Sequence, residues 1–373
     1  MMAAHRRSSS SGCTPIIPAD TLERAARYRE ALIAGAAEPG VLLAEQLQGL
    51  GQGQARQLDQ LTPLELLGLL CDTRRPRIFA ESEVAGDGSD WTLAELGLLG
   101  DCSMALPVTV FDNGDHTAPV AHPRPFPATL VFVAGALLRN DQGQEPADWR
   151  EVVDGRGDLS PAGLLGLYRR RLLPLLRWIN ADAAAPRSAL ITVPGLGCGQ
   201  FAGPFRGQLG PLLERVLRTL LQEAGQELPH IRAIHFDPWS ACANSREWIH
   251  GLLYQVRPSK AAGNQPIPQL CAPSAYAGPE AEVSAEDFSA CRLYSLVAWD
   301  HVSWPGNDFY GGARCTDDGV KAAATDAMAV ITGMAGAYDP QQGCYLPPPP
   351  FRTWGEVVEV RRRHHGLRLW NPG

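Results

Sequence analysis

Two stretches of the sequence concentrate residues that could do chemistry. Residues 299–319 read WDHVSWPGNDFYGGARCTDDG, and residues 194–207 read PGLGCGQFAGPFRG. The aspartates of the first stretch are Asp300, Asp308, Asp317 and Asp318. Clustered carboxylates can bind a metal or exchange protons with a hydroxyl-rich substrate, and exposed glycine amides can hold phosphate. These stretches are therefore the candidate functional loops.

Local structure explains some of these aspartates but not all of them. Asp317 and Asp318 suit the first turn of a helix, where the helix dipole favours each carboxylate by about 0.3–1 kcal/mol. Asp308 suits a turn after Pro-Gly-Asn. Asp300 has no such explanation, because it stands where the apolar run LYSLVAW ends. Carboxylates that converge there raise at least one pKa unless a cation or a ribose diol compensates, which favours a functional site.

The glycine-rich stretch has two interpretations that its residues leave open. It lies between an apolar run and a predicted helix, where free backbone N–H groups can cradle phosphate. It is not a Walker loop, because no Gly-Lys-Ser/Thr follows, and its spacing does not match the GxGxxG of dinucleotide-binding folds. A tight connection without a ligand is the alternative.

An alternation of strands and helices must position these loops. Continuous apolar runs predict buried strands at 104–111, 128–138, 188–195, 231–236 and 293–299. Predicted helices are 163–179, preceded by the cap pair Ser160-Pro161 and containing Pro174, then 211–224 and 317–334. This order predicts a three-layer α/β/α sandwich around a mixed, largely parallel sheet. Ligands in such folds bind at the carboxyl ends of the strands, where both candidate loops begin.

The rest of the chain divides into three further regions. Residues 1–16 are Ser-rich and predict a disordered tail, while 17–100 predict a helical N-terminal extension. The extension concentrates no chemically useful side chains, so packing or partner binding is its expected role. Residues 101–373 form the predicted catalytic domain, with 258–290 as a Pro-, Ala- and Ser-rich surface insertion.

Composition excludes several classes of protein. The formal net charge of -7 gives no basic field for nucleic acid or an anionic membrane. The 9 cysteines form no CxxC pair, so neither a zinc site nor a disulfide framework is expected. No stretch is long and apolar enough for a membrane span or a signal peptide. Since nothing marks a classical export route, we expect a cytoplasmic protein.

At the two loops the sequence resembles the macrodomain superfamily. A strand leading into GLGCGQFAG is similar to the diphosphate loop of ADP-ribose-binding macrodomains and poly(ADP-ribose) glycohydrolases, and AWDHVSWPGNDFYGG is similar to their catalytic loop. The resemblance is strongest to the branch of the Legionella effector MavL and its relatives, which are arginine-specific ADP-ribosyl hydrolases acting on ubiquitin. It runs from about residue 104 to about residue 360 and does not cover the N-terminal helices.

The resemblance implies roles for individual residues. Asp300, Asp308 and Asp318 are implied to be catalytic, although reasoning from the residues alone leaves the choice between Asp317 and Asp318 open. Contacts with ADP-ribose are implied for Gly195, Leu196, Gly197, Cys198, Gly199, Gln200, Phe201, Asp237, Trp304, Asn307, Phe309, Tyr310, Gly311, Gly312 and Asp317. His301 is a further candidate wall of the ribose site, and Phe236 and Trp239 join Asp237 on the adenine side.

The implied activity is hydrolysis of the N-glycosidic bond between ADP-ribose and arginine in a modified protein, with ubiquitin as a candidate substrate. No metal or cofactor is expected, although the aspartates leave a Mg²⁺-dependent glycohydrolase open. A reader that binds ADP-ribose without hydrolysing it is the alternative from another class. The glutamate pair of poly(ADP-ribose) glycohydrolases is absent, and the two loops stand in reversed order along the chain.

Overall fold

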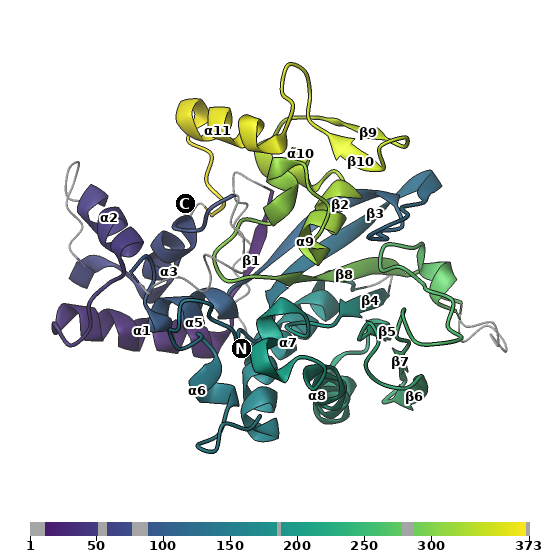
Figure 1. The fold of residues 1–373 in the computed structure, drawn as a ribbon, viewed down its shortest axis with the longest axis horizontal. Helices are drawn as coiled ribbons and strands as arrows, with labels where there is room; N and C mark the ends of the chain where they lie inside the picture. The colour runs from purple at the N-terminus through teal and green to yellow at the C-terminus, as the bar shows by residue number, and fades with distance from the viewer. Residues whose placement is uncertain (1–11, 51–57, 77–88, 185–187, 278–286, 371–373) are drawn as a thin grey trace.

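The computed structural model describes residues 12–50, 58–76, 89–184, 188–277 and 287–370. Its centre is an eight-stranded sheet in the order β1-β2-β3-β8-β4-β5-β7-β6 (Figure 1). The strands are β1 Thr14–Ile16, β2 Ser103–Asp112, β3 Ala121–Ala134, β4 Ala189–Pro194, β5 Ile231–Asp237, β6 Ser245–Ile249, β7 Leu252–Val256 and β8 Arg292–Trp299. The five strands from β3 to β7 in this order are parallel, and the outer ones are antiparallel. The predicted mixed, largely parallel sheet is confirmed.

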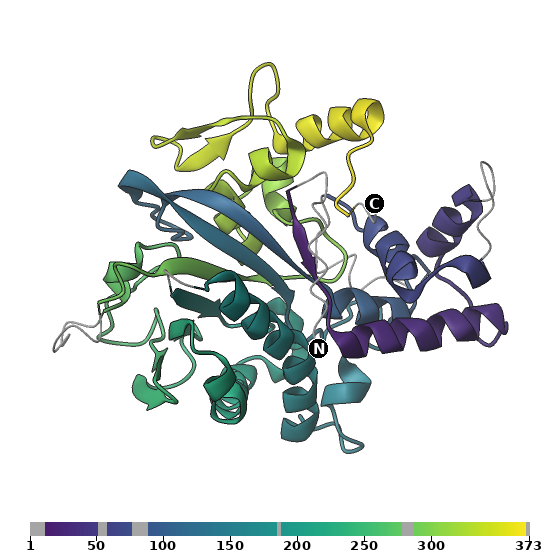
Figure 2. The same cartoon turned by 180° about the vertical axis from the view of Figure 1, so that it is seen from behind.

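Helices cover both faces of the sheet and complete the three layers. On one face, α7 (Pro161–Asp182) and α8 (Leu209–Ala224) bury their leucines against the strands. On the other face lie α9 (Asp317–Ala323), α10 (Ala327–Thr332) and α11 (Trp354–His365). Figures 1 and 2 show the two groups on opposite sides of the strands. The sheet is therefore buried on both faces, which explains why its strands read as continuous apolar runs.

Two predicted elements differ from the observed ones. The helix predicted over 317–334 is broken into α9 and α10, because Thr325 forms a bridge with Val110 and Asp326 accepts a hydrogen bond from the backbone N–H of Thr109 (2.7 Å). Strand β3 begins at Ala121, seven positions before the predicted start at 128, because the Pro-rich segment pairs with β2 as a long hairpin. The contact that breaks the helix joins segments far apart in sequence, whereas the hairpin pairs neighbouring segments.

The N-terminal region contains α1 (Ala19–Ile33), α2 (Val41–Leu50), the 3-10 turn η1 (Leu58–Gln60), α3 (Pro63–Asp72) and α5 (Leu93–Asp101). Thr62 caps α3 with Pro63 at its first position, as predicted. The prediction of a disordered tail over 1–16 is wrong for Thr14–Ile16, because they pair with Ser103–Ala105 as the edge strand β1. Residues 1–11 lie outside the described residues. The boundary between extension and catalytic domain stays a prediction.

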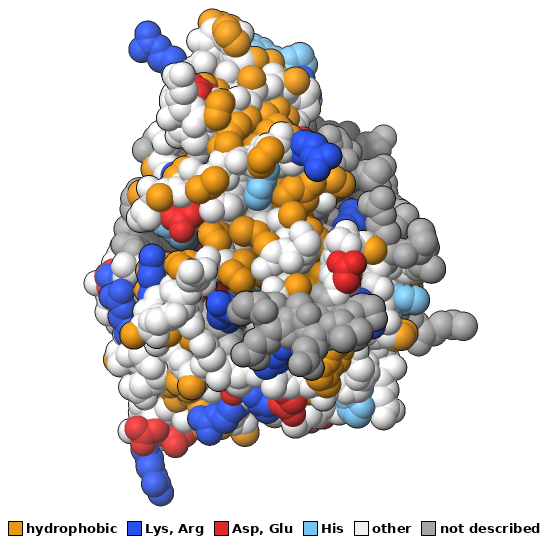
Figure 3. Space-filling model, turned by 90° about the vertical axis from the view of Figure 1, so that its right-hand side faces the viewer, with side chains coloured by type: hydrophobic (Ala, Val, Ile, Leu, Met, Phe, Trp, Pro, Cys, Tyr) orange, Lys and Arg blue, Asp and Glu red, His pale blue; other side chains and the backbone are white. Residues whose placement is uncertain are grey.

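Smaller elements surround the sheet. They are α6 (Trp149–Val152), η2 (Gln200–Phe205), η3 (Gly225–Glu227), η4 (Pro273–Tyr276), η6 (Asn307–Gly311), β9 (Ala337–Asp339) and β10 (Cys344–Leu346). On the side where β9, β10 and the β2–β3 hairpin lie, hydrophobic side chains gather over the upper part of the surface (Figure 3). None of the described helices is long and apolar enough to cross a membrane.

Candidate active site

The two candidate loops leave the sheet side by side. Strands β4 and β8 pair only as far as Thr192 and Ser295, although β8 continues along β3 to Trp299. After β4 the chain continues to α8 on one face, and after β8 it continues to α9 on the other. In open α/β sheets, the crevice that binds ligands lies at such a divergence at the carboxyl ends of parallel strands. The glycine-rich loop (195–206) and the aspartate loop (300–316) both begin there.

Asp300 holds the aspartate loop together. One carboxylate oxygen accepts the backbone N–H groups of Val302 (2.8 Å) and Ser303 (2.6 Å). The other oxygen accepts the Ser303 hydroxyl (2.6 Å) and the side-chain amide of Asn307 (3.0 Å). Asp300 is buried, and these four hydrogen bonds occupy both of its oxygens. Asp300 therefore stabilises the turn formed by residues 300–307.

Asp308 joins the same loop to the start of α9. Its carboxylate accepts the backbone N–H groups of Cys315 (2.7 Å) and Thr316 (3.3 Å) and the hydroxyl of Thr316. The helix comes very close here: a Cβ added to Gly319 would lie 1.9 Å from a carboxylate oxygen of Asp308. Gly319 is thus a positioning residue that only the tertiary contact reveals.

Asp317 forms an ion pair inside the helix that follows. Its carboxylate accepts the backbone N–H of Ala298 (2.8 Å) and lies 2.9 Å from the ammonium of Lys321. Lys321 is buried and also donates to Leu296 O and to Gln269 Oε1. Burial lowers its pKa, which the nearby charges of Asp317, Asp318 and Asp237 oppose. The four-residue spacing of Asp317 and Lys321 on a helix is the sequence signal that could have predicted this ion pair.

Asp318 differs from the other three aspartates. One of its oxygens accepts the backbone N–H of Gly306 (2.6 Å), and the other has no hydrogen-bond partner among the described residues. The side chain is only 2% exposed. Burial, and then the charges of Asp300, Asp308 and Asp317, raise its pKa well above the usual range. A buried carboxyl with a free oxygen and a raised pKa can hold and exchange a proton at the site.

The aromatic side chains and the histidine of the aspartate loop point into the protein. Trp304, Phe309 and Tyr310 are buried in the hydrophobic core on the α9 side. The Tyr310 hydroxyl donates to Pro305 O (3.0 Å). His301 is buried with its ring 3.4 Å from the Asp148 carboxylate. In this structure these residues support the loop and do not form a wall of the crevice. Gly311 and Gly312, by contrast, are exposed.

The glycine-rich loop depends on close backbone contacts. A Cβ on Gly135, just after β3, would lie 2.2 Å from the backbone nitrogen of Gly197. Gly197 itself has φ 71°, and a Cβ there would lie 2.8 Å from the nitrogen of Ala136. The Tyr168 hydroxyl donates to Leu196 O (2.7 Å) below the loop. Only glycine fits at both positions, so the loop has a fixed shape.

This shape leaves backbone donors free. Within the described residues, the N–H groups of Gly197 and Gly199 donate to no protein acceptor, whereas that of Cys198 donates to Gly195 O (3.0 Å). Burial raises the pKa of the Cys198 thiol to about 12, so it is not a thiolate nucleophile. Phe201 is half-buried against His301, with 6.1 Å between the ring centres. Leu196 is buried and Gln200 is exposed.

The predicted adenine side lies at the end of β5. Asp237 accepts the backbone N–H groups of Trp239 (2.8 Å) and Ser259 (2.9 Å). Burial raises its pKa. Trp239 is 52% exposed, and the Lys260 ammonium lies 5.1 Å from its ring centre. Phe236, in contrast, is fully buried in the core. An exposed aromatic ring is available at this end of the crevice, and it belongs to Trp239.

The N-terminal region clamps the aspartate loop, which the sequence did not predict. The Arg74 guanidinium donates to His301 O (3.0 Å), and the Trp304 indole donates to Arg74 O (3.0 Å). The Arg75 backbone N–H donates to Val302 O (2.9 Å), and the Trp304 backbone N–H donates to Arg75 O (2.8 Å). The helical extension therefore has a structural role at the site. No signal in the local sequence of Arg74 and Arg75 indicated it.

Metal binding receives no geometric support. No group of three or more His, Cys, Asp or Glu side chains in the described part of the chain is arranged to hold a metal ion. Asp300 and Asp308 already use both oxygens within the protein.

Comparison with protein families identifies a match over most of the chain. The family model described as "Macrodomain effector MavL" matches residues 14–351. The matched range begins at β1 and includes the N-terminal helices, which the resemblance at the two loops did not cover. A search of curated proteins finds no match.

Proposed function

The chain belongs to the family of the macrodomain effector MavL, and from this premise we propose that it hydrolyses the bond between ADP-ribose and arginine in modified proteins. The observation that carries the proposal is Asp318: its buried, unpaired oxygen lies among three further carboxylates at the carboxyl end of β8. Ubiquitin is the first protein substrate to examine, and the cytosol of a host cell is the expected place of action.

ADP-ribose would lie along the carboxyl edge of the sheet. The free N–H of the exposed Gly199 supports binding of the diphosphate, because backbone donors suit phosphate oxygens. The adenine would lie towards Trp239 and the distal ribose towards the aspartate loop. The strand order β5, β4, β8 places the three loops in the same order as these three parts of the ligand.

The carboxylates would act on the reacting ribose through their charge. Cleavage of the N-glycosidic bond passes through an oxocarbenium-like state, and fixed negative charges stabilise it. Asp300 and Asp308 suit this task, because their hydrogen bonds hold both carboxylates in fixed positions. Neither has an oxygen free to serve as a nucleophile.

Asp318 would move the proton. When the bond between C1″ and the guanidine nitrogen breaks, its electron pair leaves with the nitrogen, and Asp318 donates its proton there. Water then adds to C1″ and returns a proton to Asp318, so the products are ADP-ribose and arginine. The raised pKa of Asp318 supports this role, because an acid must be protonated before the step.

A linkage panel tests the proposal. Arginine-, glutamate- and serine-linked ADP-ribose are offered to the wild-type protein and to Asp308→Ala and Asp300→Ala, with and without chelator. We expect release from arginine alone, loss of release in both variants and no effect of chelator. Unchanged turnover in either variant contradicts the proposal. Binding without release on any linkage identifies a reader instead, and loss of activity in chelator identifies a metal-dependent enzyme.

A further inference from the structure

A group of buried charged side chains lies where α7 meets α5 and the segment after β3. Its centre is Arg171 on α7, which pairs with Asp101 at the end of α5 and with Asp148 just before α6. All three residues are at most 3% exposed. The packing is tight, since a Cβ on Gly100 would lie 2.7 Å from Arg171 and 2.5 Å from the His301 ring. Charges that lose their hydration in this way persist only where partners replace it.

Arg171 holds the end of strand β3. Its guanidinium donates to both carboxylates over 2.7–3.2 Å, and it also donates to two backbone carbonyls, Ala134 O (3.3 Å) and Gly135 O (3.1 Å). Gly135 is the residue against which Gly197 of the glycine-rich loop packs. The place of Gly135 therefore sets the place of that loop's backbone.

Tyr168 supports the same segment from one turn earlier on α7. Its hydroxyl accepts the N–H of Ala136 (3.2 Å) and donates to Leu196 O (2.7 Å). Residues three positions apart lie on the same face of a helix, so Tyr168 and Arg171 both face the segment after β3. This face of α7 therefore supports the glycine-rich loop.

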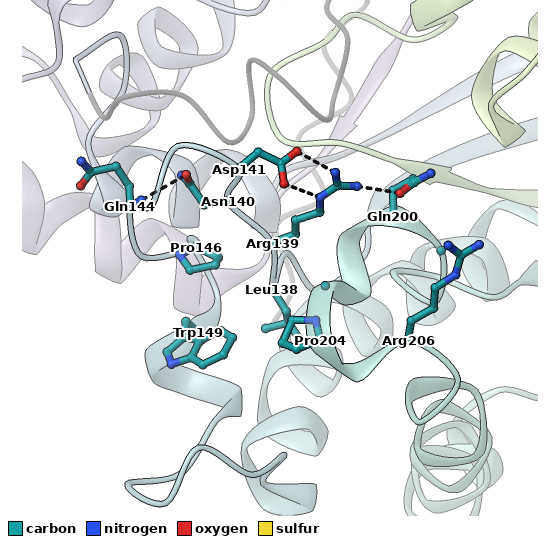
Figure 4. Close-up of a pocket in the computed structure, with 12 residues that line it drawn as sticks. Leu138, Arg139, Asn140, Asp141, Gln144, Pro146, Trp149, Gln200, Pro204 and Arg206 are labelled. Carbon is teal, nitrogen blue, oxygen red and sulfur yellow. Dashed lines mark hydrogen bonds and ion pairs between the residues drawn. The ribbon is translucent and has the colours of Figure 1, made fainter.

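The segment after β3 stays attached to the glycine-rich loop further along the chain. Leu138 N–H donates to Phe201 O (2.8 Å), and the Arg139 guanidinium donates to the side chain of Gln200 (2.7 Å). Figure 4 shows the two segments around a cavity, with Arg139 and Gln200 joined between them. A shift of the segment at Arg171 would thus carry the glycine-rich loop with it.

Asp148 extends the cluster to the other loop. Its carboxylate accepts the N–H of Leu137 (2.8 Å) and lies 3.4 Å from the ring Nε2 of His301, the residue that follows Asp300 in the aspartate loop. Burial raises the pKa of Asp148, but the Arg171 guanidinium and His301 outweigh burial and hold that pKa well below its usual range. A charged Asp148 thus joins Arg171 to the aspartate loop.

We infer that Arg171 is a positioning residue that fixes the distance between the glycine-rich loop and the aspartate loop. Through Gly135 it holds the support of the first loop, and through Asp148 it holds His301 in the second. The inference rests on the proposed function, because it assumes that ADP-ribose is bound across both loops. Arg171 is buried and acts only through these neighbours.

The binding of two ligands tests the inference. ADP carries only the adenosine and the diphosphate, whereas ADP-ribose also reaches the aspartate loop. The ratio of their dissociation constants therefore measures how well both loops are engaged at once. Calorimetry gives this ratio for the wild type and for Arg171→Lys, which keeps the positive charge but loses the planar fork of donors. Release of ADP-ribose from arginine at saturating substrate is measured on the same proteins.

In Arg171→Lys the preference for ADP-ribose over ADP should fall about tenfold and kcat about 10- to 100-fold, because the distal ribose no longer meets the aspartate loop in register. Tyr168→Phe, which loses contacts around the glycine-rich loop alone, should weaken both ligands by the same factor. Arg170→Gln is the matched control on the same helix. Arg170 bonds to Asp101 and Glu151 but to neither loop, so the ratio and kcat should be unchanged whatever the loss of stability.

An unchanged ratio in Arg171→Lys, or an equal change in Arg170→Gln, overturns the inference and leaves the proposed function intact. If Arg171→Lys does not fold, Asp148→Asn takes its place and should show the same loss of preference. A wild type that binds ADP-ribose but releases none from arginine overturns the proposed function, while the ratio still decides the inference. If the wild type binds ADP-ribose no more tightly than ADP, the ligand does not span the two loops and the inference is wrong.

Discussion

The two loops at the carboxyl edge of the sheet are held in shape in opposite ways. The glycine-rich loop after β4 gains its shape from the absence of side chains, since Gly135 and Gly197 let two backbone segments touch. The aspartate loop after β8 gains its shape from side chains, since Asp300 and Asp308 together accept seven hydrogen bonds from their own loop and the start of α9. One loop offers backbone donors, and the other offers fixed negative charge.

Among the aspartates, those that hold the loop in shape differ from the one that has an oxygen free to exchange a proton. Asp300, Asp308 and Asp317 all have partners, whereas Asp318 keeps one buried oxygen without a partner. We therefore expect the proton transfer of the aspartate loop to depend on this one carboxyl, which lies among three others that are hydrogen-bonded within the protein. Variants in both loops test this contrast.

The largest effect is expected at Asp318. Asp318→Asn keeps the oxygen that accepts Gly306 N–H but removes the exchangeable proton, so kcat should fall about 10²- to 10⁴-fold. Single-turnover release of ADP-ribose from arginine measures the loss. Asp317→Asn is the matched control in the same helical turn. An equal loss in Asp317→Asn would show that the two positions are not distinct.

Asp300→Ala should lose activity and stability together. Its removal leaves the backbone N–H groups of Val302 and Ser303 without an acceptor in a buried turn, at a cost on the order of 2–4 kcal/mol. Urea unfolding measures the loss in free energy of unfolding. Asp318→Asn should not lose a comparable free energy of unfolding at neutral pH. A fully stable Asp300→Ala protein would contradict the structural role of this carboxylate.

Gly197→Ala should weaken the other loop. The added methyl meets the nitrogen of Ala136 at 2.8 Å in a backbone conformation with φ 71°, so the loop must shift. We expect stability to fall by about 1–3 kcal/mol and ADP-ribose affinity, measured by calorimetry, to fall with it. Gly207→Ala is the control, because its φ of 87° is also positive but nothing lies within 4 Å. If both variants bind ADP-ribose equally well, the close approach is not what shapes the site.

The smallest effect concerns the dependence of stability on pH. The folded-state pKa of Asp318 is raised, so the protein is favoured while this group is protonated, and that advantage is lost as pH rises through the folded-state pKa. Asp318→Asn carries no such group. Its stability relative to the wild type should therefore be greater at high pH than at low pH, as measured by thermal unfolding across the pH range. A stability difference that does not change with pH would contradict the raised pKa.

Much of the fold could be predicted from the sequence, because strands buried on both faces read as uninterrupted apolar runs. The two loops could be found as well, since glycines and aspartates stand out at the ends of such runs. Contacts between distant segments could not be predicted: the break at Thr325 and the clamp by Arg74 depend on partners far away in sequence. The close approach of Gly319 to Asp308 depends on how the loop between them folds. For the same reason, the sequence singled out Asp300, whereas the structure singles out Asp318. Asp300 stood out from its position at the strand end, but only the folded loop shows that its oxygens are occupied.

The pH dependence of arginine-linked ADP-ribose release, measured in the wild type and in Asp318→Asn, tests most directly whether Asp318 carries the proton. Because Asp318 must be protonated to donate, wild-type activity should decline as pH rises through its raised pKa. The variant should bind ADP-ribose with wild-type affinity, release it at the residual rate and show no such decline. A variant that retains both the wild-type rate and the wild-type pH profile would contradict the central claim that Asp318 carries the proton.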